Sequence, residues 1–183
     1  MSCVEATVVT AHAGRLTAAA LFFPTEFGIA GSPLSAGGAL APLADQIDVQ
    51  SGADFVAAWT VHAEAVVMRA GLGTPLQEAF DRADVGPAES SLSGPTTVVV
   101  ITDGEPNCFS DATLTGVPTD TEPNRAAAWL ADGIETWVIG LPGANGILVL
   151  QDIANAAGTT LIGPADADAM RAELERIFAE PCP

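Results

Sequence analysis

Two loops of this 183-residue chain carry side chains that could bind a hard cation. One contains Asp103, which follows the β-branched run at residues 96–102 and precedes Gly104. The other contains Thr74, whose neighbour Pro75 favours the first position of a helix. Carboxylates and hydroxyls are oxygen ligands of the kind that Mg²⁺ takes. Both loops also have a purely structural interpretation, because a Thr can cap a helix and Asp-Gly is a common turn.

Other kinds of site lack the residues that they need. The chain has no Lys, no Walker A loop and no Gly-x-Ser-x-Gly elbow, which disfavours phosphate binding and serine-hydrolase chemistry. His12 and His62 have no Cys or His partner at metal-ligand spacing, and Cys108 has no basic neighbour to favour its thiolate. We therefore predict that the protein is not an enzyme.

The elements that must position Thr74 and Asp103 alternate between short apolar strands and amphipathic helices, as in an α/β domain. The expected strands lie at residues 16–23, 96–102, 135–139 and 159–162, with one weak edge strand within 26–50. The expected helices lie at 4–12, 54–69, 75–83, 123–131, 147–157 and 166–179, with Ser51 and Asp166 as caps and Gly133 as a stop. Because ligands gather beyond the carboxyl ends of parallel strands, Asp103 is expected at that edge.

The length and net charge of the chain indicate its number of domains and exclude some kinds of partner. Residues 1–183 are expected to form a single domain. Six Arg oppose 23 acidic residues, and the resulting net charge of −17 disfavours nucleic acids and anionic lipid surfaces as partners. The longest apolar runs, at 18–23 and 98–101, are far too short for a membrane span. We expect no nucleic-acid partner and no membrane span.

Several segments, taken in order, resemble the von Willebrand factor A family. They are residues 15–24 (RLTAAALFFP), 73–76 (GTPL), 98–107 (VVVITDGEPN), 137–143 (WVIGLPG), 153–159 (IANAAGT) and the closing helix. The resemblance covers nearly the whole chain. It implies a Rossmann-like fold, in which a doubly wound and mostly parallel sheet is flanked by helices.

The resemblance also implies a function. In that family Mg²⁺ or Mn²⁺ lies above the sheet in a metal-ion-dependent adhesion site, and an acidic residue of the protein partner completes the metal shell. On this sequence the implied metal ligands are Thr74 and Asp103. The chain is therefore expected to be a non-enzymatic protein-binding or adhesion module.

One family motif is missing. No Asp-x-Ser-x-Ser, which supplies further metal ligands in that family, occurs in this chain. We expect Met1 to be the Met that follows this motif, so that the domain lacks its first central strand. Since Mg²⁺ gives up water reluctantly, the incomplete site should bind metal weakly or not at all. The exposed sheet edges would then permit self-association.

The three cysteines leave alternatives open. The family topology implies that Cys3 and Cys108 lie near the metal face, where they could pair, and that Cys182 lies at the opposite end. All three could equally be unpaired small apolar residues. Their number and positions favour an extracytoplasmic location (secreted, periplasmic or cell-surface), although the chain shows no signal peptide and the cytoplasm stays an alternative.

Two other functions fit the same residues. One is a metal-independent scaffold of the same fold that binds partners through its acidic surface. The other is a hydrolase or phosphotransferase on a doubly wound fold, with Asp103 as nucleophile or metal ligand. The second requires a Lys and a second strand-end Asp, and the absence of Lys argues against it.

Overall fold

A computed structural model describes residues 17–21, 46–65, 76, 79, 80, 83, 96–104 and 122–179. These residues fall into two compact units. The first unit holds β1 (Thr17–Leu21), β2 (Gln46–Ser51), α2 (Gly52–Ala65) and α6 (Ala167–Ala179). The second holds β3 (Thr97–Thr102), α4 (Glu122–Ala131), β4 (Glu135–Gly140) and α5 (Leu148–Ala156). The expected mixed α/β architecture is confirmed. In the described part of the chain, no helix is both long and apolar enough to cross a bilayer.

In the first unit, β1 pairs antiparallel with β2, and the chain continues directly into α2. Ser51 begins this helix as the sequence predicts, because its hydroxyl accepts the Asp54 N–H at 3.4 Å and donates to the Asp54 carboxylate at 2.6 Å. The buried Phe55 ring lies 5.7 Å from Trp59 and anchors the apolar side of α2. The expected helix at 54–69 is thus confirmed as far as residue 65.

Helix α6 also follows its sequence pattern. Asp166 accepts the Ala169 N–H at 2.8 Å and caps the first turn. Met170, Leu174 and Ile177 recur at helical spacing and are buried, whereas Phe178 is only half-buried. Both predictions for this helix, its cap and its apolar face, are confirmed apart from Phe178.

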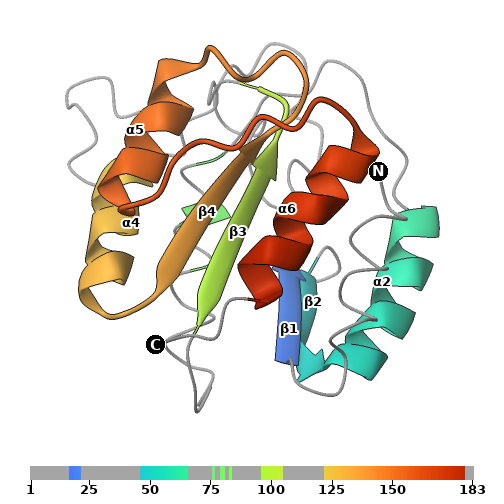
Figure 1. Cartoon of the computed structure of the whole chain (residues 1–183). Helices are drawn as coiled ribbons and strands as arrows, with labels where there is room; N and C mark the ends of the chain where they lie inside the picture. The colour runs from blue at the N-terminus through green and yellow to red at the C-terminus, as the bar shows by residue number, and fades with distance from the viewer. Residues whose placement is uncertain are drawn as a thin grey trace, which may run out of the picture. The chain divides into compact units, whose positions relative to one another are not determined.

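In the second unit, β3 and β4 form a parallel pair that runs from Thr97 opposite Glu135 to Thr102 opposite Gly140. Helices α4 and α5 contact each other, and both contact β4 (Figure 1). Their interior includes the stacked rings of Phe80 and Trp129, which lie 4.9 Å apart at 11°. The fully buried side chains around them include those of Leu76, Val138, Leu150 and Ile153.

Both helices of this unit end at a glycine with positive φ, 79° at Gly133 and 72° at Gly158. After α4, the Gly133 N–H donates to the carbonyl of Leu130, and the next N–H donates to that of Trp129. After α5, the Gly158 N–H donates to Asn155, and the following N–H donates to Ala154. This pair of hydrogen bonds is the Schellman motif, which needs a left-handed residue and so favours glycine. The expected stop at Gly133 is confirmed.

The expected strand at 159–162 is wrong in extent. Only Ile162 pairs with β4, donating to Val138 at 2.9 Å and accepting from Gly140 at 2.8 Å. Upstream, the Thr159 hydroxyl donates to the Thr136 carbonyl at 2.9 Å and takes the acceptor that would extend the ladder. Downstream, Pro164 has no N–H to donate. The parallel pairing is therefore one bridge long, and the order across this unit is β3, β4, Ile162.

One edge of β3 is unpaired within the described part of the chain. The Thr102 carbonyl faces β4, where the loop residue Leu141 donates to it at 2.8 Å. Because successive residues of a strand direct their backbone groups to opposite edges, those of Thr97, Val99 and Ile101 face away from β4. No described residue hydrogen-bonds to them. The described strands accordingly form two separate two-stranded sheets.

The buried hydroxyl of Thr136 offers a test of the packing in this unit. Thr136 is fully buried, and its hydroxyl has no hydrogen-bond partner among the described residues. Thr136→Val should raise the free energy of unfolding by about 1 kcal/mol, because it removes an unsatisfied polar atom and keeps the shape. Thr159→Val should lower it by about 1 kcal/mol, because the Thr159 hydroxyl is bonded. Urea unfolding measures both, and a destabilising Thr136→Val would contradict this interpretation.

Candidate functional site

Asp103 lies immediately beyond the carboxyl end of β3, as the sequence predicts. Its side chain is exposed, whereas the preceding Thr102 is buried. The Thr102 hydroxyl accepts the Gly104 N–H at 3.3 Å and donates to the Gly104 carbonyl at 3.3 Å. The hydrogen bonds of the Thr102 hydroxyl therefore hold the turn that carries Asp103, and Thr102 itself belongs to a strand that is paired with β4. Such an arrangement presents a carboxylate to solvent from a fixed backbone position.

The loop after β4 reaches the same edge of the sheet, because β3 and β4 are parallel and Thr102 pairs with Gly140. This loop is tightly folded. Ala144 is fully buried and donates to the Leu141 carbonyl at 2.9 Å, and Gly143 takes a φ of 106° that favours glycine. The carboxyl edge thus combines the exposed Asp103 with a compact second loop.

Only one of the two predicted metal ligands can be placed. Thr74 lies outside the described residues, as do His12, Cys3, Cys108 and Cys182. In the part of the chain that the structure describes, no group of three or more His, Cys, Asp or Glu side chains could hold a metal ion. Of the two predicted ligands only Asp103 is placed at this edge, and Mg²⁺ would need further oxygen ligands from Thr74, from water or from a partner.

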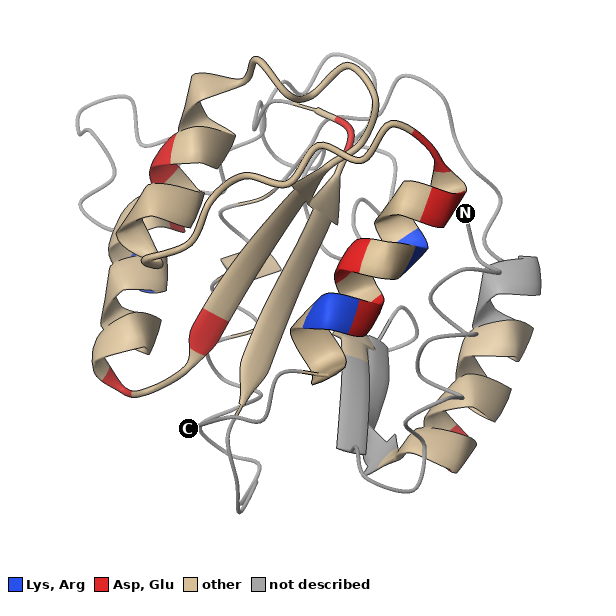
Figure 2. Cartoon of the chain, in the orientation of Figure 1, with Lys and Arg blue, Asp and Glu red and all other residues tan. Residues whose placement is uncertain are grey.

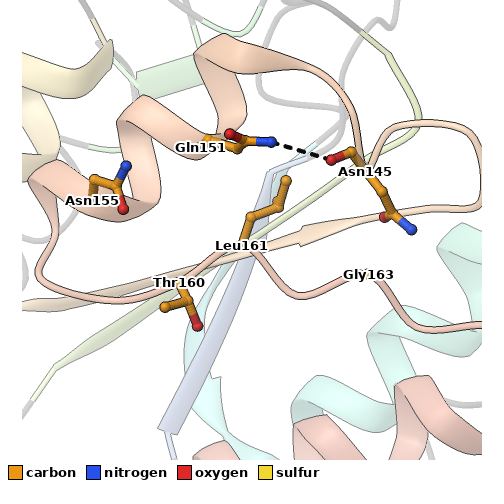
Figure 3. Close-up of a pocket in the computed structure, with 6 residues that line it drawn as sticks. All are labelled: Asn145, Gln151, Asn155, Thr160, Leu161 and Gly163. Atoms are coloured by element: carbon orange, nitrogen blue, oxygen red, sulfur yellow. Dashed lines mark hydrogen bonds between the residues drawn. The ribbon is translucent and has the colours of Figure 1, made fainter.

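Sequence reasoning missed a polar pocket of about 380 Å³ in the second unit. Figure 3 shows its walls, with Gln151 and Asn155 on α5 and the loop that carries Leu161 and Gly163 opposite them. The Gln151 amide N–H donates to the Asn145 carbonyl at 3.3 Å. The lining residues are Asn145, Gln151, Asn155, Thr160, Leu161 and Gly163. The only signal in the sequence was the recurrence of uncharged amides on and before the α5 helix.

The charges of α6 are largely balanced within the helix. Arg171 bonds Glu175 at 2.9 Å and Arg176 bonds Glu173 at 2.9 Å (Figure 2). All four side chains are more than a third exposed, and such surface pairs contribute little to stability. Elsewhere in Figure 2 most of the described residues are uncharged, and most of the charged ones are acidic. The net charge of −17 therefore leaves a negative field that attracts cations.

No protein-family model and no curated protein matches this chain. Among solved structures, the chain is similar to proximal thread matrix protein 1 from the mussel byssus. The two share 13% sequence identity and superpose with a TM-score of 0.56, over 96% of this chain and 39% of the mussel protein. At that identity the similarity supports the fold alone. The present chain spans well under half of the mussel protein's length.

Proposed function

We propose that this protein is a non-enzymatic binding module that contacts a protein partner at the carboxyl edge of the β3–β4 sheet. The observation that carries the proposal is the exposed Asp103 carboxylate, held in place by the buried Thr102 at the end of a paired strand. The parallel pair, its flanking helices and the resemblance to the von Willebrand factor A family support a doubly wound, Rossmann-like sheet.

In this proposal a divalent cation, Mg²⁺ or Mn²⁺, joins the two proteins. Asp103 supplies a carboxylate and Thr74 a hydroxyl, and an acidic side chain of the partner completes the oxygen shell. The negative surface raises the local concentration of cations near the site. Two protein ligands hold Mg²⁺ weakly, so the affinity for metal alone is low and rises when the partner binds. The cysteines favour an extracytoplasmic location, where such partners are met.

Calorimetric titration with Mg²⁺ and Mn²⁺ tests the metal part of the proposal. We expect weak binding that Asp103→Ala reduces by about tenfold or more, because it removes the only charged ligand. Asp152→Ala is the matched control, since Asp152 is an exposed carboxylate on α5 outside the site. Equal binding by wild type and Asp103→Ala would refute a role of Asp103 in metal binding. A micromolar affinity of the wild type for Mg²⁺ would refute the expectation that the site lacks ligands.

A metal-independent scaffold of the same fold is the second candidate. It is favoured by the net charge of −17, which comes from 23 acidic residues against six Arg. In that case the acidic surface itself binds a basic partner, and binding weakens as salt screens the charges. Chelation of divalent ions separates the two candidates, because it abolishes binding only in the first.

We also propose that the open edge of β3 permits association with a second copy of the chain. The outward backbone groups of Thr97, Val99 and Ile101 are unpaired within the described residues. The strand carries no charged residue and no Pro, the two devices that commonly protect exposed edges. Two copies can therefore pair their β3 strands antiparallel about a two-fold axis.

A further inference from the structure

The segment at residues 160–163 forms an outer edge of the second unit. Ile162 directs its backbone groups toward β4, donating to Val138 and accepting from Gly140. In an extended segment the neighbours Leu161 and Gly163 direct their N–H and C=O groups to the opposite side. No described residue hydrogen-bonds to these groups. The edge therefore presents two donors and two acceptors in the spacing of a strand.

The polar pocket lies along this same edge. The amides of Asn145 and Asn155 line it, are exposed, and make no side-chain hydrogen bond with any described residue. Gln151 lies between the two asparagines, so that one helix and the loop before it supply three amides (Figure 3). Each amide offers both a donor and an acceptor. The backbone edge and the neighbouring side-chain amides thus both offer donors and acceptors that a ligand can bind.

Gly163 fixes how closely Asn145 approaches the edge. A Cβ atom at Gly163 would overlap the side-chain amide of Asn145, so this amide lies directly against the Gly163 backbone. A larger residue at Gly163 would push the amide away. The absence of a side chain here keeps Asn145 beside the main-chain groups that the edge exposes.

The chemistry of the lining selects the kind of ligand. None of the described residues that line the pocket is charged, so an ionic ligand would find no counter-charge among them. None of these described residues is aromatic either, and aromatic rings are the usual apolar anchors of compact ligands. Groups that both donate and accept, arranged along an open strand edge, match the peptide groups of an extended chain.

We propose that this edge binds an extended, uncharged polypeptide segment, which adds as a strand beside residues 160–163 while the amides of Asn145, Gln151 and Asn155 bond its backbone. Leu161, which is half-buried, offers the apolar contact for one ligand side chain. The site needs no metal, and none of its lining residues belongs to the Asp103 turn. Its success or failure is therefore independent of the function proposed above.

Displayed short random peptides provide the probe. Peptides enriched on the wild-type protein should bind Asn145→Ala/Asn155→Ala about tenfold more weakly, because two hydrogen-bonding amides are lost. Gly163→Ala should weaken binding as well, because it displaces Asn145. Asp152→Ala, on the same helix outside the lining, and Asp103→Ala should bind like wild type. Failure to enrich any peptide, or equal binding by the double variant, would overturn the proposal.

Amide hydrogen exchange on the wild-type protein tests strand addition directly, without any variant. A bound peptide should slow exchange at Leu161 and Gly163 by about tenfold or more, because their N–H groups become bonded. The Ile162 amide is the internal control, since it already donates to Val138 and should change little. A peptide that binds while leaving exchange at Leu161 and Gly163 unchanged would show that no strand is added.

Discussion

Leu150→Ala should lower the free energy of unfolding by about 3 kcal/mol. Leu150 is fully buried on α5 within the cluster that contains Phe80 and Trp129, so the substitution leaves a cavity as well as losing apolar contact. Against a total stability of about 5–15 kcal/mol, this is a large loss. Urea unfolding followed by tryptophan fluorescence gives the value, since Trp129 lies in the same cluster.

Leu148→Ala is the matched control for that substitution. Leu148 lies on the same helix and loses the same atoms, but 73% of its surface is exposed. Its substitution should change the free energy of unfolding by less than about 0.5 kcal/mol. The difference between the two variants isolates burial from helix propensity, which is the same for both. Equal losses would mean that α5 does not pack on β4 as described.

Self-association through β3 should appear as a concentration-dependent dimer in sedimentation velocity. In the two-fold arrangement Val99 lies opposite Val99 of the second copy, and Thr97 lies opposite Ile101. Thr97→Pro should weaken the dimer by about thirtyfold, because symmetry removes two N–H donors of about 1 kcal/mol each. The substitution spares the ladder to β4, since the Thr97 N–H faces away from it.

Thr97→Val keeps the N–H and serves as the control for that variant. The salt dependence of the dimer provides a second test, because added salt weakens an ionic interface but should strengthen this one. Each copy carries a charge of −17, so screening lowers the repulsion and should strengthen the dimer. A chain that stays monomeric at every concentration and salt level would contradict edge pairing.

Local signals explain why much of the fold could be predicted. The run at β3 is β-branched throughout, Ser51 and Asp166 have cap chemistry, and Gly133 has the conformational freedom that ends α4. These features depend on a few neighbouring residues and so can be read directly from the sequence. The position of Asp103 follows from the same logic, because it is simply the residue after a strand.

Features that depend on distant partners could not be predicted. Strand 159–162 shrinks to one bridge because the Thr159 hydroxyl takes a carbonyl of β4, which no local pattern encodes. The amide-lined pocket requires α5 and the edge at Leu161 to come together, and this is a tertiary juxtaposition. Pro164 was a local signal that the strand would be short, since Pro has no N–H with which to continue a ladder.

The parallel pairing of β3 with β4 has a consequence for the rate of folding. A parallel pair cannot close through a tight hairpin, so Thr97 meets Glu135 only after the chain has returned through α4. The entropy of closing that long connection must be overcome before any ladder hydrogen bond forms. Helix α4 and its Gly133 turn involve only local contacts. We therefore expect α4 and its Gly133 turn to form early, and the pairing of β3 with β4 to be the slow step of refolding.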